Sequence, residues 1–161
     1  MGSGSQILIH IYTDGGCSGN PGPGGWAYVI LKNEQGEAKG PIFLTENWGA
    51  EKSTTNNRME LMAVISALES LSREEAGAEM LNVYTDSQYV QKGMTLWLKD
   101  WKKKGWKTSG REPVKNQDLW QRLDALAGGF RVNWVWVKGH AGNEYNERCD
   151  ALTQKAIVSI K

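Results

Sequence analysis

Glu60 is a lone carboxylate on the rim of a helix whose inward-facing positions are otherwise apolar. Those apolar positions are Leu61, Val64, Ile65, Leu68 and Leu71. Counted at 100° per residue from Glu60, they fall within an arc from about 20° to 140°. Because packing at the rim of this arc restricts the side chain, Glu60 is a candidate for chemistry rather than a solvated surface acid.

Three aspartates occupy comparable positions at the ends or edges of apolar segments. Asp14 follows the β-like residues 7–12, and Asp86 follows the similar residues 80–85. Asp150 flanks the apolar stripe of the final helix by about 100°. Together with Glu60 these acids predict a site for a hard cation, because oxygen-only ligation suits Mg²⁺ or Mn²⁺ rather than Zn²⁺.

Each of the four acids also has a separate structural explanation. The Asp14-Gly15 pair is compatible with a hairpin turn, and the Asp86-Ser87 pair is compatible with a helix N-cap. For the other two acids the alternative is a surface ion pair, of Glu60 with Arg58 or Lys52 and of Asp150 with Arg148. These explanations require four independent coincidences, whereas a metal site requires one.

The 161 residues, 40% of them hydrophobic and 23% charged, predict one domain with a single core. We assign residues 6–161 to this domain and interpret residues 1–5, Met-Gly-Ser-Gly-Ser, as an expression remnant. No apolar run approaches the roughly 20 residues that span a bilayer, and no signal peptide is visible. The two cysteines, Cys17 and Cys149, lack metal-ligand spacing. We therefore expect a cytoplasmic protein with reduced thiols.

The net charge of the chain is only +1, but basic residues are concentrated between residues 99 and 115. The basic residues of this segment are Lys99, Lys102, Lys103, Lys104, Lys107, Arg111 and Lys115, against only Asp100 and Glu112. Trp97, Trp101 and Trp106 are interleaved with them. Basic side chains with aromatic neighbours are typical of phosphate-backbone binding. The alternative is a solvated helix whose tryptophans pack on the body of the protein.

The order of periodic segments predicts an α/β fold. Strands are expected over residues 6–14, 25–33, 38–47, 80–85 and 131–137, with residues 15–24 as a glycine- and proline-rich loop. Helices are expected over residues 56–72, 87–93, 95–104, 116–127 and 144–160. The first three strands should be antiparallel, whereas helical crossovers return the later strands parallel to the first. Ligands gather beyond the carboxyl ends of parallel strands, where Asp14 and Asp86 fall.

Six stretches in register resemble type 1 ribonuclease H, in particular the single-domain bacterial enzymes. They are Tyr12–Cys17 with Gly19–Trp26, Thr54–Ala63, Tyr84–Tyr89, Trp101–Lys107, Val137–Gly142 and Asn146–Asp150. The resemblance covers residues 7–157 and implies a ribonuclease H-like fold, a five-stranded mixed β-sheet flanked by α-helices. It also implies an endoribonuclease that hydrolyses the RNA strand of RNA–DNA hybrids and leaves 5′-phosphate and 3′-hydroxyl ends.

The same resemblance implies a role for each acid. Asp14, Glu60, Asp86 and Asp150 would bind two Mg²⁺ ions, with Mn²⁺ as an alternative metal. Asp14 would bridge the two ions, because a shared carboxylate offsets the repulsion between neighbouring dications. Asp150 would complete the site of one ion, and Glu60 and Asp86 would complete the site of the other. His140, in a glycine-flanked loop, would have an auxiliary role in proton transfer or product release.

Substrate contacts follow from the resemblance by position. Residues implied to read the RNA strand through its shallow minor groove are Cys17, Asn20, Asn56, Asn57 and Gln88. Tyr89 and Trp97 resemble an aromatic channel for the DNA strand, and Thr55 and Asn116 resemble parts of a DNA-phosphate pocket. The basic protrusion adds Trp101, Lys102, Lys103, Lys104 and Trp106. Ser53 is a departure from the family, because an arginine commonly stands at that position.

Two other functions are compatible with part of the sequence: a retroelement-type ribonuclease H domain and a non-catalytic hybrid-binding module. The self-contained length and the basic protrusion argue against the first, and the presence of all four carboxylates argues against the second. The expected partner is an RNA–DNA hybrid, bound by a monomer, with a single-stranded DNA-binding protein as a further candidate and no membrane contact. Trp48 has no functional explanation from the sequence.

Overall fold

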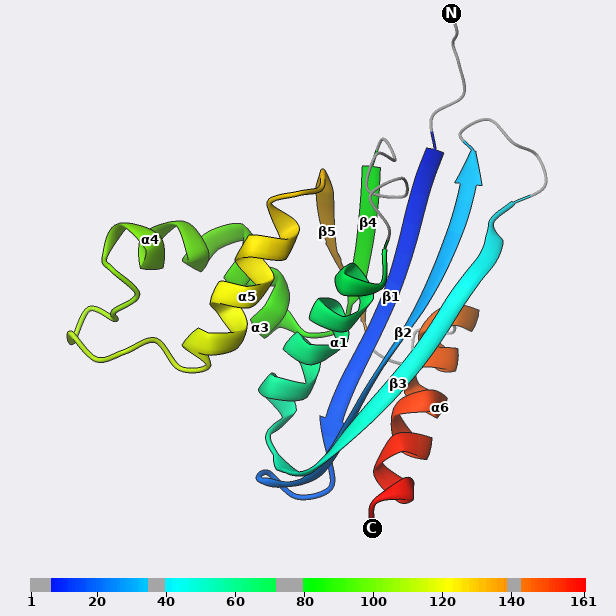
Figure 1. The fold of residues 1–161 in the computed structure, drawn as a ribbon, viewed down its shortest axis with the longest axis horizontal. Coiled ribbons are helices and arrows are strands. Elements are labelled where there is room, and N and C mark those ends of the chain that lie inside the picture. Colours follow the sequence, from blue (N-terminus) through cyan, green and yellow to red (C-terminus); the bar gives the residue numbers. More distant parts are fainter. Residues whose placement is uncertain (1–6, 35–39, 72–79, 139–142) are drawn as a thin grey trace, which may run out of the picture.

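The computed structural model describes residues 7–34, 40–71, 80–138 and 143–161, and Figure 1 shows their arrangement. One mixed sheet has the strand order β3-β2-β1-β4-β5. Its strands are β1 (Ile7–Cys17), β2 (Gly22–Glu34), β3 (Ile42–Thr54), β4 (Met80–Thr85) and β5 (Val132–Trp136). β2 pairs antiparallel with β1 and β3, whereas β4 pairs parallel with β1 and β5. The predicted fold, a five-stranded mixed sheet with flanking helices, is confirmed.

The helices follow in the predicted order. They are α1 (Asn56–Ser70), α3 (Gln88–Lys92), α4 (Leu98–Lys103), α5 (Gln117–Ala127) and α6 (Glu144–Ser159), with a π-helical segment η1 (Gly93–Trp97) between α3 and α4. Thr55 caps α1, because its hydroxyl oxygen accepts a hydrogen bond from the Arg58 amide at 3.3 Å. Within the described residues no helix is long and apolar enough to cross a membrane.

Apolar side chains at alternate strand positions build a core on each face of the sheet. One face contributes Ile9, Ile11 and Ile30 to a core that α1 and α5 cover. The opposite face contributes Val29 and Leu31 to a smaller core that α6 covers. α1 and α6 therefore hold the sheet between them (Figure 1), and both pack against β1.

Two predicted boundaries are wrong. Residues 15–24 are not a single loop, because β1 continues to Cys17 and pairs there with Gly24 of β2. The third strand spans residues 42–54 rather than 38–47, because β2 is long enough to pair with it as far as Thr54. The extended ladder places Asp14 inside β1, opposite Ala27, so the hairpin-turn explanation for Asp14 is also wrong.

The basic segment projects to one side of the sheet. Figure 1 shows α4 and the chain after it extending beyond α3 and α5. The predicted helices over residues 87–93 and 95–104 form one continuous run through η1. Gly93 allows this run to approach α5, since a Cβ atom at Gly93 would lie 1.9 Å from the Trp120 ring.

Trp48 has a structural role. It packs against the smaller core on β3, and the ammonium nitrogen of Lys155 lies 5.7 Å from the centroid of its ring. This distance is typical of a cation–π contact, so Trp48 helps to fasten α6 to the edge of the sheet.

Candidate active site

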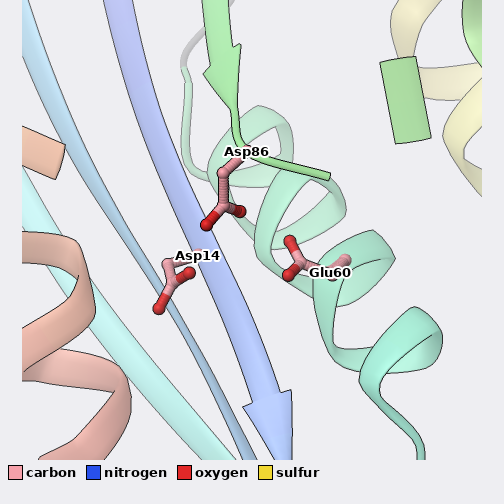
Figure 2. Close-up of side chains that lie close together, drawn as sticks. All are labelled: Asp14, Glu60 and Asp86. Carbon is pink, nitrogen blue, oxygen red and sulfur yellow. The ribbon is translucent and has the colours of Figure 1, made fainter. Parts of the chain in front are cut away.

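Three carboxylates from three separate elements meet at the centre of the sheet. Asp14 comes from β1, Glu60 from α1 and Asp86 from the residue that follows β4. Each offers an oxygen atom within 4.8 Å of the others. Figure 2 shows the three side chains gathered where β4 ends beside β1 and α1. The structure thus brings together three of the four acids of the predicted metal site.

Gly15 sets the position of Glu60 relative to Asp14. A Cβ atom at Gly15 would lie 2.4 Å from the carbonyl carbon of Met59 and 2.6 Å from the backbone nitrogen of Glu60. Only a residue without a side chain permits this approach of backbone to backbone. The glycine after Asp14 therefore lets α1 dock closely on β1 and deliver Glu60 to the site.

The backbone of Asp86 is held from two sides. The indole nitrogen of Trp136 in β5 donates a hydrogen bond to the Asp86 carbonyl oxygen at 3.0 Å. Ser87 caps α3, since its hydroxyl oxygen accepts a hydrogen bond from the Val90 amide at 3.1 Å. The helix N-cap expected at Asp86-Ser87 is therefore confirmed at Ser87, and the cap does not use the Asp86 carboxylate. The Asp86 side chain points toward the other two acids (Figure 2).

The ion pairs that would explain the acids as surface residues do not form. Arg58 pairs with Asp118, with 2.8 Å between nitrogen and oxygen, instead of with Glu60. Arg148 pairs with Glu46 on β3 at 2.5 Å instead of with Asp150. Among the described residues, Glu60 takes part in no ion pair. Its Oε2 atom is buried and has no hydrogen-bond partner among them.

Burial and mutual repulsion raise the pKa values of two of these acids. The pKa of Asp14 rises from 3.8 to about 7, first because burial removes solvent and then because Asp86 and Asp150 are negatively charged. Hydrogen bonds from Thr153 and Gly15 oppose part of this rise. The pKa of Glu60 is raised well above its usual value by burial, Asp14 and Asp86. Buried carboxylates that raise one another's pKa values in this way are typical of functional sites, including sites that bind a cation.

Asp150 lies near this group but outside it. It is half-buried on α6, and its charge contributes to the raised pKa of Asp14. α6 is fixed against the sheet by Gly25, where a Cβ atom would lie 2.8 Å from the Cβ atom of Ala156. Asp150 does not share the 4.8 Å grouping of the other three acids, so its place in the metal site stays a prediction. His140 lies outside the described residues.

Three predicted RNA-reading residues are joined by hydrogen bonds. The Cys17 amide donates to the side-chain oxygen of Asn56 at 2.9 Å, and the Asn56 amide donates to the side-chain oxygen of Asn20 at 3.1 Å. These contacts fix the turn between β1 and β2 against the start of α1. Asn57, three residues before Glu60, and Gln88, two residues after Asp86, are exposed and available to a ligand.

Asn116 is the centre of a hydrogen-bonded chain that the sequence did not reveal. It has a left-handed backbone with φ of 59°, and its side-chain oxygen accepts from Arg58 at 3.2 Å. Its side-chain nitrogen donates a hydrogen bond to the Tyr89 hydroxyl oxygen at 3.1 Å. The same hydroxyl oxygen also accepts a hydrogen bond from the indole nitrogen of Trp120. Arg58 is thereby tied to the predicted phosphate pocket. No local pattern signals this role, because Arg58 lies 58 residues from Asn116 and 60 residues from Asp118.

The aromatic residues of the basic protrusion form a contiguous cluster. Ring centroids are 6.0 Å apart for Tyr89 and Trp97, 5.9 Å for Trp97 and Trp101, and 6.4 Å for Trp101 and Trp106. These residues are only partly buried. Packing on the body of the protein therefore covers part of their surface, and the rest is exposed to solvent. The lysines at 102, 103 and 104 are exposed, and Lys102 also pairs with Asp124 at 3.2 Å.

Comparison with known proteins agrees with this geometry. The family model described as RNase H matches residues 7–158. Ribonuclease H of Treponema denticola is 52% identical over 162 residues, with 94% of this chain and 98% of the relative covered. The solved structure of LC9-RNase H1, a type 1 RNase H, has a TM-score of 0.82 at 34% identity and covers 99% of this chain and 76% of its own.

A second solved structure contains a nucleic acid. LC11-RNase H1, in complex with an RNA/DNA hybrid, has a TM-score of 0.68 at 28% identity and covers 94% of this chain and 97% of its own. The family match and the curated relative each extend over nearly the whole domain that carries the three acids. This chain therefore belongs to the ribonuclease H family and is a ribonuclease H enzyme.

Proposed function

We propose that this enzyme is an endonuclease that hydrolyses the RNA strand of RNA–DNA hybrids and leaves 5′-phosphate and 3′-hydroxyl ends. The observation that carries the proposal is the convergence of Asp14, Glu60 and Asp86, with oxygen atoms within 4.8 Å of one another and no ion pair for Glu60 among the described residues. A hybrid bound to LC11-RNase H1 supports the choice of substrate.

The donor set fits a hard cation. All three groups supply carboxylate oxygen, and the buried Oε2 atom of Glu60 has no hydrogen-bond partner in the described part of the chain. An unpaired buried acceptor costs free energy that a cation would offset. We propose that Asp14, Glu60, Asp86 and Asp150 hold two Mg²⁺ ions, with Mn²⁺ as an alternative. Bound there, the ions would supply an activated water and stabilise the leaving 3′-oxygen.

The protein's own residues would then position the hybrid. The linked residues Cys17, Asn20 and Asn56, with the exposed Asn57 and Gln88, offer hydrogen-bonding groups beside the acids for the RNA minor groove. These contacts read helix shape and 2′-hydroxyl groups more than base identity, so cleavage should be sequence-tolerant. His140 would assist proton transfer or product release.

The DNA strand would lie on the aromatic and basic side of the site. Tyr89 and Trp97 would contact its sugars, and Thr55 and Asn116 would hold a phosphate that Arg58 helps to attract. The lysines of the protrusion would add non-specific affinity. We propose further that the enzyme acts as a monomer in the cytoplasm. A single-stranded DNA-binding protein as a partner likewise stays a prediction.

A four-substrate assay tests this function. A labelled RNA–DNA hybrid, duplex RNA, duplex DNA and single-stranded RNA are each incubated with Mg²⁺ and with EDTA. We expect metal-dependent cleavage of the hybrid RNA alone, with 5′-phosphate ends detected by digestion with an exonuclease that requires a 5′-monophosphate. The Asp14→Asn variant should lose cleavage yet retain hybrid binding. Cleavage in EDTA, or equal cleavage of duplex RNA, would contradict the proposal.

A further inference from the structure

A groove that the proposed nuclease site does not use lies between the N-terminal turn of α6 and the edge strand β3. It is open to solvent and has a volume of about 690 Å³, within the range of ligand-binding pockets. Val29, Phe43 and Tyr145 supply its apolar surface. Its charged residues are Glu46, Glu144, Glu147 and Arg148. Because Val29 faces α6, the groove is on the side of the sheet opposite α1.

The groove lies beside an open sheet edge. Phe43, which pairs with Leu31 on the α6 face of the sheet, is 53% exposed although it is a large hydrophobic residue. In the described part of the chain β3 pairs only with β2, so its outer backbone groups are available. An extended peptide can hydrogen-bond to such an edge and place alternate side chains into an adjacent pocket. A small molecule would use the pocket but not the edge.

The charge of the groove selects among peptides. Arg148 and Glu46 neutralise each other through hydrogen bonds of 2.9 and 2.5 Å. Glu144 and Glu147 are exposed and belong to none of the ion pairs between described residues. Two carboxylates without an ion-pair partner in the described part of the chain therefore border the apolar surface, in the first turn of α6. They repel nucleic acid and acidic peptides, and they attract a positively charged partner.

We propose that this groove docks a cationic peptide segment of another protein. An aliphatic or aromatic side chain of the segment would pack between Phe43 and Tyr145, and its arginine or lysine side chains would lie beside Glu144 and Glu147. The site leaves the basic protrusion free, because the groove lies on β2, β3 and α6 whereas the protrusion lies on η1, α4 and the residues that follow α4. A partner could then hold the enzyme on α6 while the hybrid occupies the nuclease site.

Titration of ¹⁵N-labelled enzyme with a synthetic peptide tests this docking. The probe is a capped six-residue peptide of alternating arginine and leucine, and its counterpart has glutamate in place of arginine. Chemical-shift changes should be confined to residues 42–48 and 144–149, and the acidic peptide should produce none. The Phe43→Ala variant and the Glu144→Gln/Glu147→Gln double variant should each weaken binding by about fivefold or more.

Two matched variants control for non-specific effects. Leu96→Ala removes an exposed apolar side chain from η1, and Glu112→Gln removes an exposed carboxylate from the loop after α4; neither should change the affinity. If Phe43→Ala loses the native amide spectrum, the double variant decides alone, because it removes charge without removing packed atoms. Shifts centred on Gly15 and Asp86, unchanged affinity in the double variant, or equal binding of the acidic peptide would overturn the proposal.

Discussion

Asp14→Asn should stabilise the metal-free protein above neutral pH, although it should abolish cleavage. The pKa of Asp14 in the folded protein is about 7, against 3.8 for an ordinary aspartate. Between these values the folded state binds the proton more tightly, so the free energy of unfolding falls as the pH rises. At about 1.4 kcal/mol per pKa unit, the complete loss above pH 7 is about 4 kcal/mol.

The stabilising contribution of protonated Asp14 is fully present below pH 3.8 and is lost as the pH rises through about 7. An asparagine has nearly the same shape and no charge to lose. It also removes one of the negative charges that raise the pKa of Glu60. We therefore expect the variant to exceed the wild type by roughly 2–4 kcal/mol at pH 8 and by only about 1 kcal/mol at pH 4.5.

Urea unfolding in EDTA at pH 4.5 and pH 8, followed by circular dichroism, measures both differences. Glu112→Gln is the matched control, since it neutralises an exposed loop carboxylate and should change stability by less than about 0.5 kcal/mol at either pH. Added Mg²⁺ should raise the midpoint of the wild type more than that of Asp14→Asn. A variant that is equally stable or less stable than the wild type at pH 8 would refute the argument that Asp14 is destabilised by burial and repulsion.

Three further substitutions test how the site is positioned. Gly15→Ala should cost roughly 1–3 kcal/mol or more and reduce cleavage, because the new Cβ atom would lie 2.4 Å from the Met59 carbonyl carbon. Gly110→Ala is its control in the same denaturation assay, since the nearest atom there is 3.9 Å away. Arg58→Ala should raise KM for the hybrid severalfold with little change in kcat, because Asn116 loses the hydrogen bond that Arg58 donates at 3.2 Å. A fall in kcat as large as the rise in KM would contradict a role for Arg58 in substrate binding alone. Replacing Lys102, Lys103 and Lys104 by glutamine should make the plot of log affinity against log salt concentration less steep. The slope should change by about 0.9 for each phosphate that these lysines neutralise. An unchanged slope would mean that they contact no phosphate.

The sequence predicts which helices and strands form more accurately than it predicts the residues at which they begin and end. Helix α1 and strand β4 were correctly located, because their apolar periodicity is read directly from neighbouring residues. The glycine content of residues 15–17 and 22–24 predicts a loop, although these residues belong to β1 and β2. Glycine is locally typical of turns, and only the pairing with a second strand shows that it serves close packing instead.

The sequence by itself determined which residue types are available: four acids at the margins of apolar elements, a basic segment with tryptophans, and an α/β order of strands and helices. These properties follow from local chemistry and periodicity, which do not depend on distant contacts. The tertiary structure decided that Asp14, Glu60 and Asp86 meet, because α1 docks on the bare backbone of Gly15. It also decided that Arg58 turns away from Glu60 to Asp118 and Asn116. Contacts between residues nearly sixty positions apart depend on how the elements pack, and no local pattern in the chain encodes them.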